Sequence, residues 1–378
     1  MYPLEDVKVI DFSFHLPGPM ASLILSEAGA DVVKVERPGT GDELRMIPPF
    51  AGDESLSFAM LNRGKKSVCL DLKNPRAFEM LEPLLREADV LIEQFRPGVM
   101  ERLGFGYDAI RAVNPRIVYC SITGYGQTGP ARMKAGHDLN YCAETGLLSL
   151  SGDISGRPTV PQVTIADIAG GSYPAVMNIL LALRRKDKTG AGCHLDISMT
   201  RNLFALQYWA VGETAFHGKP PAPSDALLTG GSPRYAIYEA GDGRYLAAAP
   251  IEDRFWQRFC ELIELPEEYR DDAKDPERTR TVVAAIMARA PVDHWDRLLG
   301  ADCCCAKVRN MEEAMADAHF AATGTFDRKV VTRDGRTLTG TTVPIDSALS
   351  VSSDRMQAPK LGEQNSLLFH SGPKDGTD

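Results

Sequence analysis

Residues 4–38 read LEDVKVIDFSFHLPGPMASLILSEAGADVVKVERP, and this stretch decides the fold. An apolar run at 7–12 predicts a buried β-strand, and a second run at 31–36 predicts another. The segment 17–28 between them is typical of a helix, because it opens at a proline and ends before Gly29. Strand, helix and strand within about 30 residues form a βαβ unit, whose two strands are parallel.

The same alternation continues through the first half of the chain. Its apolar pattern predicts further strands at 67–72, 89–93, 116–123 and 193–199. Helices are expected at 75–87, 98–103, 108–113, 138–150, 167–185 and 201–214. We therefore predict an α/β fold with a mostly parallel sheet, helices on both faces, and ligands beyond the carboxyl ends of the strands.

The second half of the chain has a different character. Residues 216–232 are rich in Gly, Pro and Ser, which is typical of a linker. Strands at 235–238 and 245–249 flank a turn and predict a hairpin, and helices are expected at 255–263, 279–290, 292–299 and 311–317. We expect a smaller α+β domain here, followed by a β-rich segment at 328–344.

The composition limits the classes of function. The 378 residues are 44% hydrophobic and 25% charged, which is ordinary for a globular chain of about two domains. Acidic residues exceed basic ones by 51 to 42, giving a net charge of −9, which argues against a general nucleic-acid binder. We see no signal-peptide pattern, and no apolar run approaches the roughly 20 residues of a membrane span. We therefore expect a cytoplasmic protein without a nucleic-acid or membrane partner.

The eight cysteines include the adjacent run Cys303, Cys304 and Cys305. No two of them have C-x-x-C spacing, and three adjacent thiols fit one tetrahedral metal site poorly. We expect reduced thiols that pack in the core or at the surface, and no metal.

One glycine motif invites a nucleotide-binding interpretation. Residues 124–129, GYGQTG, match G-x-G-x-x-G. Pro130 follows directly and the motif does not come after the first strand, so the context of a dinucleotide site is missing. The sequence does not favour a nicotinamide dehydrogenase.

Asp167 lies in QVTIADIAGG, residues 162–171, just ahead of a long apolar helix. Two interpretations stay open: a helix N-cap, or an active-site carboxylate. Gly170 and Gly171 favour the second interpretation, because small residues would let a ligand approach the free N–H groups of the helix start.

His137 lies in KAGHDLNY, residues 134–141. We expect Asp138 to cap the next helix, which would place His137 just outside the helix end. The histidine is either an ordinary loop side chain or an acid–base group. Basic side chains also recur near predicted strand ends, where they would be either solvated or gathered around one phosphate-bearing ligand: Arg37, Arg63, Lys65, Lys66, Lys73, Arg96, Arg102 and Lys134.

Taken together, these segments resemble the class III CoA-transferase family, the CaiB/BaiF type, from Leu4 to about Leu368. The matching stretches are LEDVKVID at 4–11, AGADVVKVERP at 28–38, NRGKKS at 62–67, LDLK at 70–73, RPG at 96–98, SITGYG at 121–126 and KTG at 188–190. The resemblance implies a Rossmann-like large domain built from 1–215 and 330–378, with a small domain at 216–329 inserted. It also implies a homodimer of interlocked subunits.

Within the family, the intact GHDLNY motif at 136–141 is most similar to that of alpha-methylacyl-CoA racemases. The resemblance implies that His137 and Asp167 exchange protons with the α-carbon of a 2-methylacyl-CoA, and that Glu252 orients the histidine. Inversion would pass through an enolate, stabilised by backbone N–H groups at the start of the Asp167 helix. No cofactor is needed beyond the CoA of the substrate, and the reaction would belong to lipid metabolism.

A transferase is the alternative that the resemblance leaves open. There Asp167 would attack an acyl-CoA and carry the acyl group as a mixed anhydride. The glycine-rich lid expected of a formyl-CoA transferase is not apparent at 228–234, which reads LTGGSPR.

The resemblance also implies which residues bind CoA in either reaction. The nucleotide site is expected at Arg37, Leu70, Asp71, Leu72 and Lys73. Further contacts are expected from Gln94, Phe95, Arg96, Arg102 and Lys134.

Overall fold

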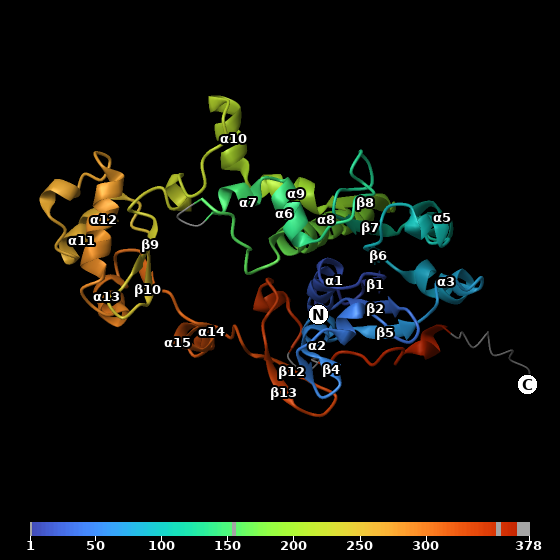
Figure 1. The fold of residues 1–378 in the computed structure, drawn as a ribbon. Coiled ribbons are helices and arrows are strands. Elements are labelled where there is room, and N and C mark those ends of the chain that lie inside the picture. The colour runs from blue at the N-terminus through green and yellow to red at the C-terminus, as the bar shows by residue number, and fades with distance from the viewer. Residues whose placement is uncertain (1, 153–155, 353–356, 369–378) are drawn as a thin grey trace, which may run out of the picture. The chain divides into compact units, whose positions relative to one another are not determined.

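The structure, a computed structural model, describes residues 2–152, 156–352 and 357–368 (Figure 1). The chain forms two compact units. The first comprises Met1–Thr145, Pro161–Leu206 and His319–Asp378, and the second comprises Gly146–Val160 and Gln207–Ala318. These limits differ from the expected boundaries at 215/216 and 329/330. Residues 146–160 join the second unit, where the Ser224 hydroxyl donates to the Gly152 carbonyl at 3.1 Å.

A six-stranded sheet organises the first unit, in the order β5-β2-β1-β6-β7-β8. Every neighbouring pair is parallel, which confirms the α/β expectation. The order reverses between β1 and β6, and ligands of such sheets bind at this switch point. The strands are β1 (Lys8–Asp11), β2 (Asp31–Glu36), β5 (Lys66–Cys69), β6 (Val90–Glu93), β7 (Val118–Thr123) and β8 (Cys193–Ser198).

Helices pack on this sheet through apolar side chains. Helix α1 (Pro17–Glu27) contacts β1, β2 and α8 (Tyr173–Thr189), and α8 contacts β7 and β8. Helices α3 (Ala77–Glu87) and α5 (Tyr107–Val113) belong to another core, in which Leu81 and Ile110 meet strand residues such as Ile10 and Val68. Successive strand side chains therefore fill two separate cores.

The outer edge of β5 is covered by a segment from far along the chain. The Ser67 N–H donates to Gln364 Oε1 at 2.7 Å, and the Gln364 N–H donates back to the Ser67 carbonyl at 2.8 Å. The Cys69 N–H donates to Asn365 Oδ1, also at 2.7 Å. These bonds satisfy backbone groups that an edge strand would otherwise expose.

The second unit has its own antiparallel sheet, β11-β10-β9. The predicted hairpin is present, with Tyr245 opposite Glu239. Helices surround a core that includes Trp256, Trp295 and two of the adjacent cysteines, Cys303 and Cys305. The elements are β9 (Ala236–Glu239), β10 (Tyr245–Ala248), α11 (Asp253–Leu262), α12 (Pro276–Met287), α13 (Val292–Leu299) and β11 (Cys305–Lys307).

Two predicted helices are broken. The expected helix 138–150 becomes α6 (Asp138–Glu144) and α7 (Leu147–Leu150), because Gly146 between them has a φ of +82°. The expected helix 201–214 becomes α9 (Met199–Leu206) and α10 (Tyr208–His217). The remaining elements are β3 (Phe50–Ala51), β4 (Glu54–Ser55), α2 (Leu56–Asn62), α4 (Val99–Arg102), α14 (Met311–Met315), α15 (Ala318–Ala322), β12 (Arg328–Val331) and β13 (Thr337–Gly340).

The helix that follows the Asp167 segment is long. From the sequence we expected no apolar stretch that could span a membrane, but among the described residues Ala166–Thr189 reaches that length and apolarity. Half of the 18-residue window that meets this criterion is buried inside the protein. Its buried positions, such as Ala175, Ile179 and Ala182, follow helical spacing, as in a core helix.

Candidate active site

Two cavities open in the first unit at the carboxyl ends of the strands. The first has a volume of about 290 Å³ and the second about 830 Å³. Phe14, which follows β1, and Phe95, which follows β6, line both cavities. Since β1 and β6 flank the switch point, both cavities lie where this sheet order predicts a ligand.

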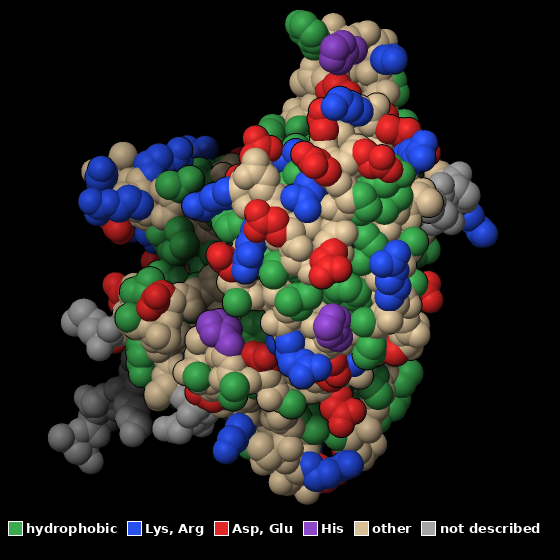
Figure 2. All heavy atoms as spheres, turned by 90° about the vertical axis from the view of Figure 1, so that its left-hand side faces the viewer, with side chains coloured by type: hydrophobic (Ala, Val, Ile, Leu, Met, Phe, Trp, Pro, Cys, Tyr) green, Lys and Arg blue, Asp and Glu red, His purple; other side chains and the backbone are tan. Residues whose placement is uncertain are grey.

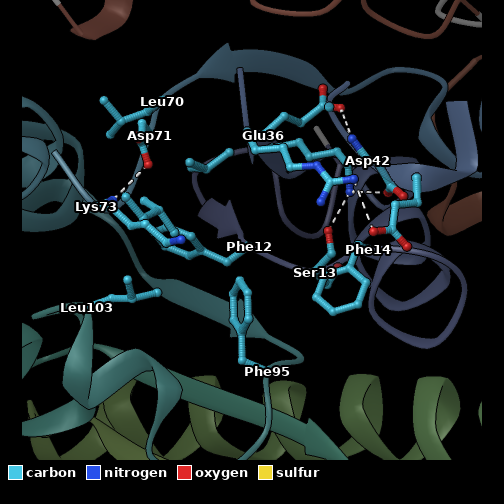
Figure 3. A pocket seen from close by; sticks show the side chains of 16 residues that line it. Phe12, Ser13, Phe14, Glu36, Asp42, Leu70, Asp71, Lys73, Phe95 and Leu103 are labelled. Carbon is cyan, nitrogen blue, oxygen red and sulfur yellow. Dashed lines mark hydrogen bonds and ion pairs between the residues drawn. The ribbon is translucent and has the colours of Figure 1, made fainter. Parts of the chain in front are cut away.

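The first cavity collects most of the residues expected to bind the CoA nucleotide. Figure 3 shows Leu70, Asp71 and Lys73 approaching it from one side, and Phe95 and Leu103 from another. Neighbouring strand ends explain the grouping, because β2 ends at Glu36 and the adjacent β5 ends at Cys69. The predicted residues in its lining are Arg37, Leu70, Asp71, Leu72, Lys73 and Phe95.

Buried ion pairs fix the inner wall of the first cavity. Lys34 Nζ lies 2.9 Å from Asp42 Oδ2, with both side chains inaccessible, and it donates to the Ser13 carbonyl at 2.6 Å. Burial opposes the charges of both groups, but the attraction of Lys34 to Asp11 and Asp42, together with the hydrogen bonds of the pair, prevails. The pKa of Lys34 is therefore raised, and the pKa of Asp42 is lowered.

A second buried pair supports the same wall. Arg45 donates to both carboxylate oxygens of Glu36, at 2.8 and 2.7 Å, and its guanidinium lies 3.7 Å from the centre of the Phe58 ring. Because these pairs are satisfied internally, the ligand-facing charges of the first cavity are those at its rim. Arg37 is exposed there, where it donates to Thr40 and Glu43. An exposed guanidinium beside apolar walls can hold an anionic group attached to a flat ring.

The second cavity contains both residues expected to carry the chemistry, His137 and Asp167. It also contains four of the further expected CoA contacts, Gln94, Phe95, Arg96 and Lys134. Sequence reasoning missed several polar side chains of its lining, namely His15, Arg132, Asn140, Tyr125 and Tyr141.

Asp167 lies on a turn of π-helix, Ala166–Ser172, that runs into α8. Its N–H donates to Asp138 Oδ1 at 3.0 Å, and its carbonyl accepts from the Ser172 hydroxyl at 3.1 Å. Burial, with a smaller contribution from the charge of Asp138, raises the pKa of Asp167 to about 7. A carboxyl group with such a pKa can give or take a proton at neutral pH.

The backbone donors at this helix start are already used, which corrects one expectation. The Asp167 N–H is bound by Asp138, and the Ile168 N–H donates to the Thr164 carbonyl at 3.1 Å. These two groups are therefore not free to stabilise an enolate oxygen in this structure.

Gly170 and Gly171 also have a different purpose from the expected one. A Cβ on Gly170 would lie 2.7 Å from the Met199 carbonyl, and one on Gly171 would lie 3.2 Å from Pro17 Cβ. Asn202 of α9 donates to the Gly170 carbonyl at 2.8 Å. The two glycines therefore allow α9 and α1 to pack closely, and neither lines the two cavities.

His137 occupies the N-cap position of α6, where we expected Asp138. The His137 N–H donates to Asn140 Oδ1 at 3.0 Å, while Asp138 uses its carboxylate on Asp167. The imidazole of His137 is exposed at the wall of the second cavity. Asp138, which follows His137, thus links the His137 segment to the Asp167 segment through a hydrogen bond.

Tyr141 explains two glycines of the surrounding motifs. A Cβ on Gly124 would lie 2.5 Å from the Tyr141 ring, and one on Gly136 would lie 2.7 Å from it. The Tyr141 hydroxyl donates to the Gly136 carbonyl at 2.5 Å. Burial and the nearby charge of Asp167 raise the pKa of Tyr141 to about 12. Gly124 of the G-x-G-x-x-G match therefore makes room for a tyrosine.

Two expected site residues are not among the residues that line these two cavities. Arg102, at the end of α4, is exposed and lines neither of the two described cavities. Glu252 belongs to the second unit, where it is the exposed N-cap residue of α11. Within 2–152, 156–352 and 357–368, no group of three or more His, Cys, Asp or Glu side chains is placed to hold a metal ion.

Known proteins similar to this chain include both racemases and transferases. Alpha-methylacyl-CoA racemase of Homo sapiens is 32% identical over 331 residues, which cover 85% of this chain and 82% of the racemase. Acetyl-CoA:oxalate CoA-transferase of Acetobacter aceti is 32% identical, with 97% and 95% covered. Succinyl-CoA:glutarate CoA-transferase of Homo sapiens is 37% identical over 269 residues, but these cover only 60% of that protein and 70% of this chain.

Solved structures and a family model agree with these relatives. A CAIB/BAIF family protein from Brucella suis has a TM-score of 0.82 at 27% identity, covering 97% of this chain and 98% of that one. Rv3272 of Mycobacterium tuberculosis has a TM-score of 0.80 at 27% identity, covering 97% and 99%. The model of CoA-transferase family III matches residues 4–365. The chain therefore belongs to CoA-transferase family III.

Proposed function

We propose that this protein is a racemase or epimerase that inverts the α-carbon of a 2-methylacyl-CoA thioester. One observation carries the proposal. Asp167, whose pKa is raised to about 7, lines the same cavity as His137, and both therefore have access to one bound substrate. A nucleophilic aspartate works as the anion, whereas an acid–base aspartate benefits from a pKa near the working pH.

The reaction is a 1,1-proton transfer. Asp167 as the carboxylate takes the α-proton, and the electron pair of the C–H bond moves to the thioester oxygen as an enolate. Protonated His137 then returns a proton to the opposite face of the same carbon. In the reverse direction His137 is the base and Asp167 the acid, so no atom is gained or lost. The resemblance of this chain to the racemases of the family implies that Glu252 orients His137.

The CoA part of the substrate would occupy the first cavity. Its apolar lining, including Val35, Leu70 and Leu72, suits the adenine ring, and Arg37 and Lys73 bring cationic groups for phosphates. Phe95, which lines both cavities, would then contact the chain that leads from the nucleotide to the thioester. The bound CoA contributes binding energy, and no further cofactor takes part.

A CoA-transferase is the second candidate. The similarity to acetyl-CoA:oxalate CoA-transferase over 97% of this chain favours it. In that reaction the Asp167 carboxylate attacks the thioester carbonyl, CoA leaves as the thiolate, and a mixed anhydride remains on the aspartate. The acceptor carboxylate attacks this anhydride at the acyl carbonyl and releases the Asp167 carboxylate. The CoA thiolate then attacks the acceptor carbonyl of the new anhydride, which gives the acceptor-CoA thioester and the donor carboxylate.

Isotope exchange separates the two candidates. Incubation of a 2-methylacyl-CoA in deuterated water, followed by mass spectrometry, should place one deuterium on the α-carbon and equalise the two epimers. Acyl transfer to an added carboxylic acid without such exchange would refute the racemase. Hydroxylamine trapping of an acyl group on Asp167 would in turn establish the transferase.

We also propose a homodimer in the cytoplasm, without membrane or nucleic-acid partners. On α8 and α9, Met177, Leu181 and Phe204 are 62%, 68% and 49% exposed, and a second subunit would cover them. Basic and acidic side chains are interspersed on the face that Figure 2 shows, unlike a nucleic-acid-binding surface. Sedimentation analysis tests the dimer, and flotation with lipid vesicles tests whether the apolar face of α8 binds a membrane instead.

A further inference from the structure

Glu93 is a carboxylic acid buried beneath the wall that the two cavities share. It is the last residue of β6 and lies beside Ser121 of β7 in the parallel register. Only 4% of Glu93 is exposed. Its Oε2 accepts the Phe95 N–H at 2.8 Å, and Phe95 lines both cavities. The mechanism proposed above does not use this acid.

A chain of hydrogen bonds leads from Glu93 across the sheet. The Ser121 hydroxyl is hydrogen-bonded to the Glu93 carboxyl and lies 2.9 Å from His194 Nε2 on the next strand. His194 is stacked on Tyr107, with 5.1 Å between ring centres, and meets Tyr119 edge-on. Three neighbouring strands thus contribute one polar group each to a continuous network.

The pKa values of Glu93 and His194 bear on which group donates each hydrogen bond of this network. Burial raises the pKa of Glu93 to about 7, although the hydrogen bonds from Ser121 and Phe95 oppose the shift. Desolvation lowers the pKa of His194. The Ser121 hydroxyl therefore donates to the Glu93 carboxyl, and the neutral imidazole of His194 can donate its Nε2–H to the Ser121 oxygen. The second carboxyl oxygen then remains free to accept the Phe95 N–H.

The turn that Glu93 holds has several neighbours. The Phe95 ring meets Phe14 at 5.5 Å between centres, and Phe14 also lines both cavities. Gln94, between Glu93 and Phe95, accepts the Gly18 N–H of α1 at 2.9 Å. A displacement of residues 93–95 would therefore move the shared wall.

We infer that Glu93 is a positioning residue for the acyl-CoA site, which fixes the Phe95 backbone through a network that reaches Ser121 and His194. It touches no substrate and acts through Phe95. The inference rests on the proposed function only in placing acyl-CoA across the two cavities.

Two substitutions distinguish hydrogen bonding from mere bulk. Glu93→Gln keeps an oxygen for the Phe95 N–H and an N–H₂ group for Ser121, whereas Glu93→Leu leaves the Phe95 donor buried and unpaired. We expect Glu93→Leu to weaken binding of free CoA about tenfold, and to raise KM for the acyl-CoA equally with kcat changed less than threefold. Glu93→Gln should bind CoA within about twofold of the wild type. Titration calorimetry with free CoA gives the affinity without any assumption about the reaction.

Asn114→Ala is the matched stability control. Asn114 is also buried, donates to the carbonyls of Leu85 and Ala88 at 2.9 and 2.7 Å, and is outside the lining of both cavities. Urea unfolding should show a loss of stability for this variant without any loss of CoA affinity. Equal loss of affinity in Asn114→Ala and Glu93→Leu would overturn the inference, as would unchanged affinity in Glu93→Leu.

Ser121→Ala provides an independent variant if Glu93→Leu does not fold. It removes the middle of the network and should weaken CoA binding about threefold. Wild-type affinity in Ser121→Ala together with a tenfold loss in Glu93→Gln would also contradict the inference. A wild-type protein that does not bind CoA at all would instead refute the proposed function.

Discussion

The two cavities of the first unit are built in different ways. The inner wall of the first cavity is held by buried ion pairs, such as Lys34–Asp42, that use strand ends and leave little freedom. Much of the second cavity is lined by the loop before α6, where Arg132 and His137 are exposed. Rigid elements suit the binding of a constant group, and loops suit reaction chemistry. Substitutions in the two cavities should therefore affect different kinetic constants.

The largest expected effect is at Asp167. Asp167→Asn should lower proton exchange at the α-carbon by about 10³- to 10⁴-fold, because an amide cannot accept the proton. CoA affinity should stay within about twofold of the wild type, since Asp167 is not part of the first cavity. Asp187→Asn, an exposed position on the same helix, is the control. A parallel loss of CoA affinity would show that the two cavities are not separable.

The next largest effect is expected at His137, whose substitution should slow inversion while proton exchange on the Asp167 side continues. His137→Ala should slow inversion by about 10²- to 10³-fold. The epimer whose α-proton faces Asp167 should still exchange that proton with deuterated water, without inversion. Chiral chromatography combined with mass spectrometry measures both quantities. His294→Ala, an exposed position in the second unit, should change neither. Full inversion in His137→Ala would remove this histidine from the mechanism.

The pH dependence sharpens the role of Asp167. Its pKa is raised to about 7, so only about a tenth of the carboxyl is ionised at pH 6. In the direction that uses Asp167 as the base, kcat/KM should therefore fall about tenfold per pH unit below pH 7. Initial rates from one pure epimer between pH 5 and 9 test this. A flat profile would mean that Asp167 is not the base in that direction.

The smallest effect is expected in the first cavity. Arg37→Ala should raise KM about fivefold and leave kcat unchanged, because the exposed guanidinium contributes one screened contact to a phosphate. Arg76→Ala is the matched control, since Arg76 is exposed, pairs with Glu79 and lies outside both cavity linings. A fall in kcat of Arg37→Ala would mean that nucleotide binding and chemistry are coupled.

The strands of the parallel sheet could be predicted because each is a local apolar run. Five of the six lie within predicted segments, β5 begins one residue before its predicted segment, and β2 has the predicted limits, Asp31–Glu36. Helix breaks were harder, because Gly146 ends α6 through its backbone conformation and leaves the apolar spacing intact. The cover of β5 was not predicted, since Gln364 reaches Ser67 across 297 positions and no local pattern marks that contact.

In the candidate site, too, the residues at strand ends could be predicted from the sequence, whereas those that depend on tertiary contacts could not. The residues that follow β2 and β5 could be expected together, since adjacent parallel strands end at one edge. The pairing of Asp42 with Lys34 and the packing of Tyr141 against Gly124 depend on side-chain contacts beyond one strand or helix, which no local apolar pattern marks. Gly170 and Gly171 were assigned a wrong purpose for the same reason, because Met199 lies 28 or more positions away in the sequence.

The segment that covers β5 has a consequence for how the protein is made. A ribosome completes β5 long before it reaches residues 364 and 365, so the growing chain carries an open strand edge throughout that interval. Such an edge can recruit a strand from another nascent chain. The period of greatest risk of aggregation therefore ends only when this late segment leaves the ribosome, well after the six strands themselves have been synthesised.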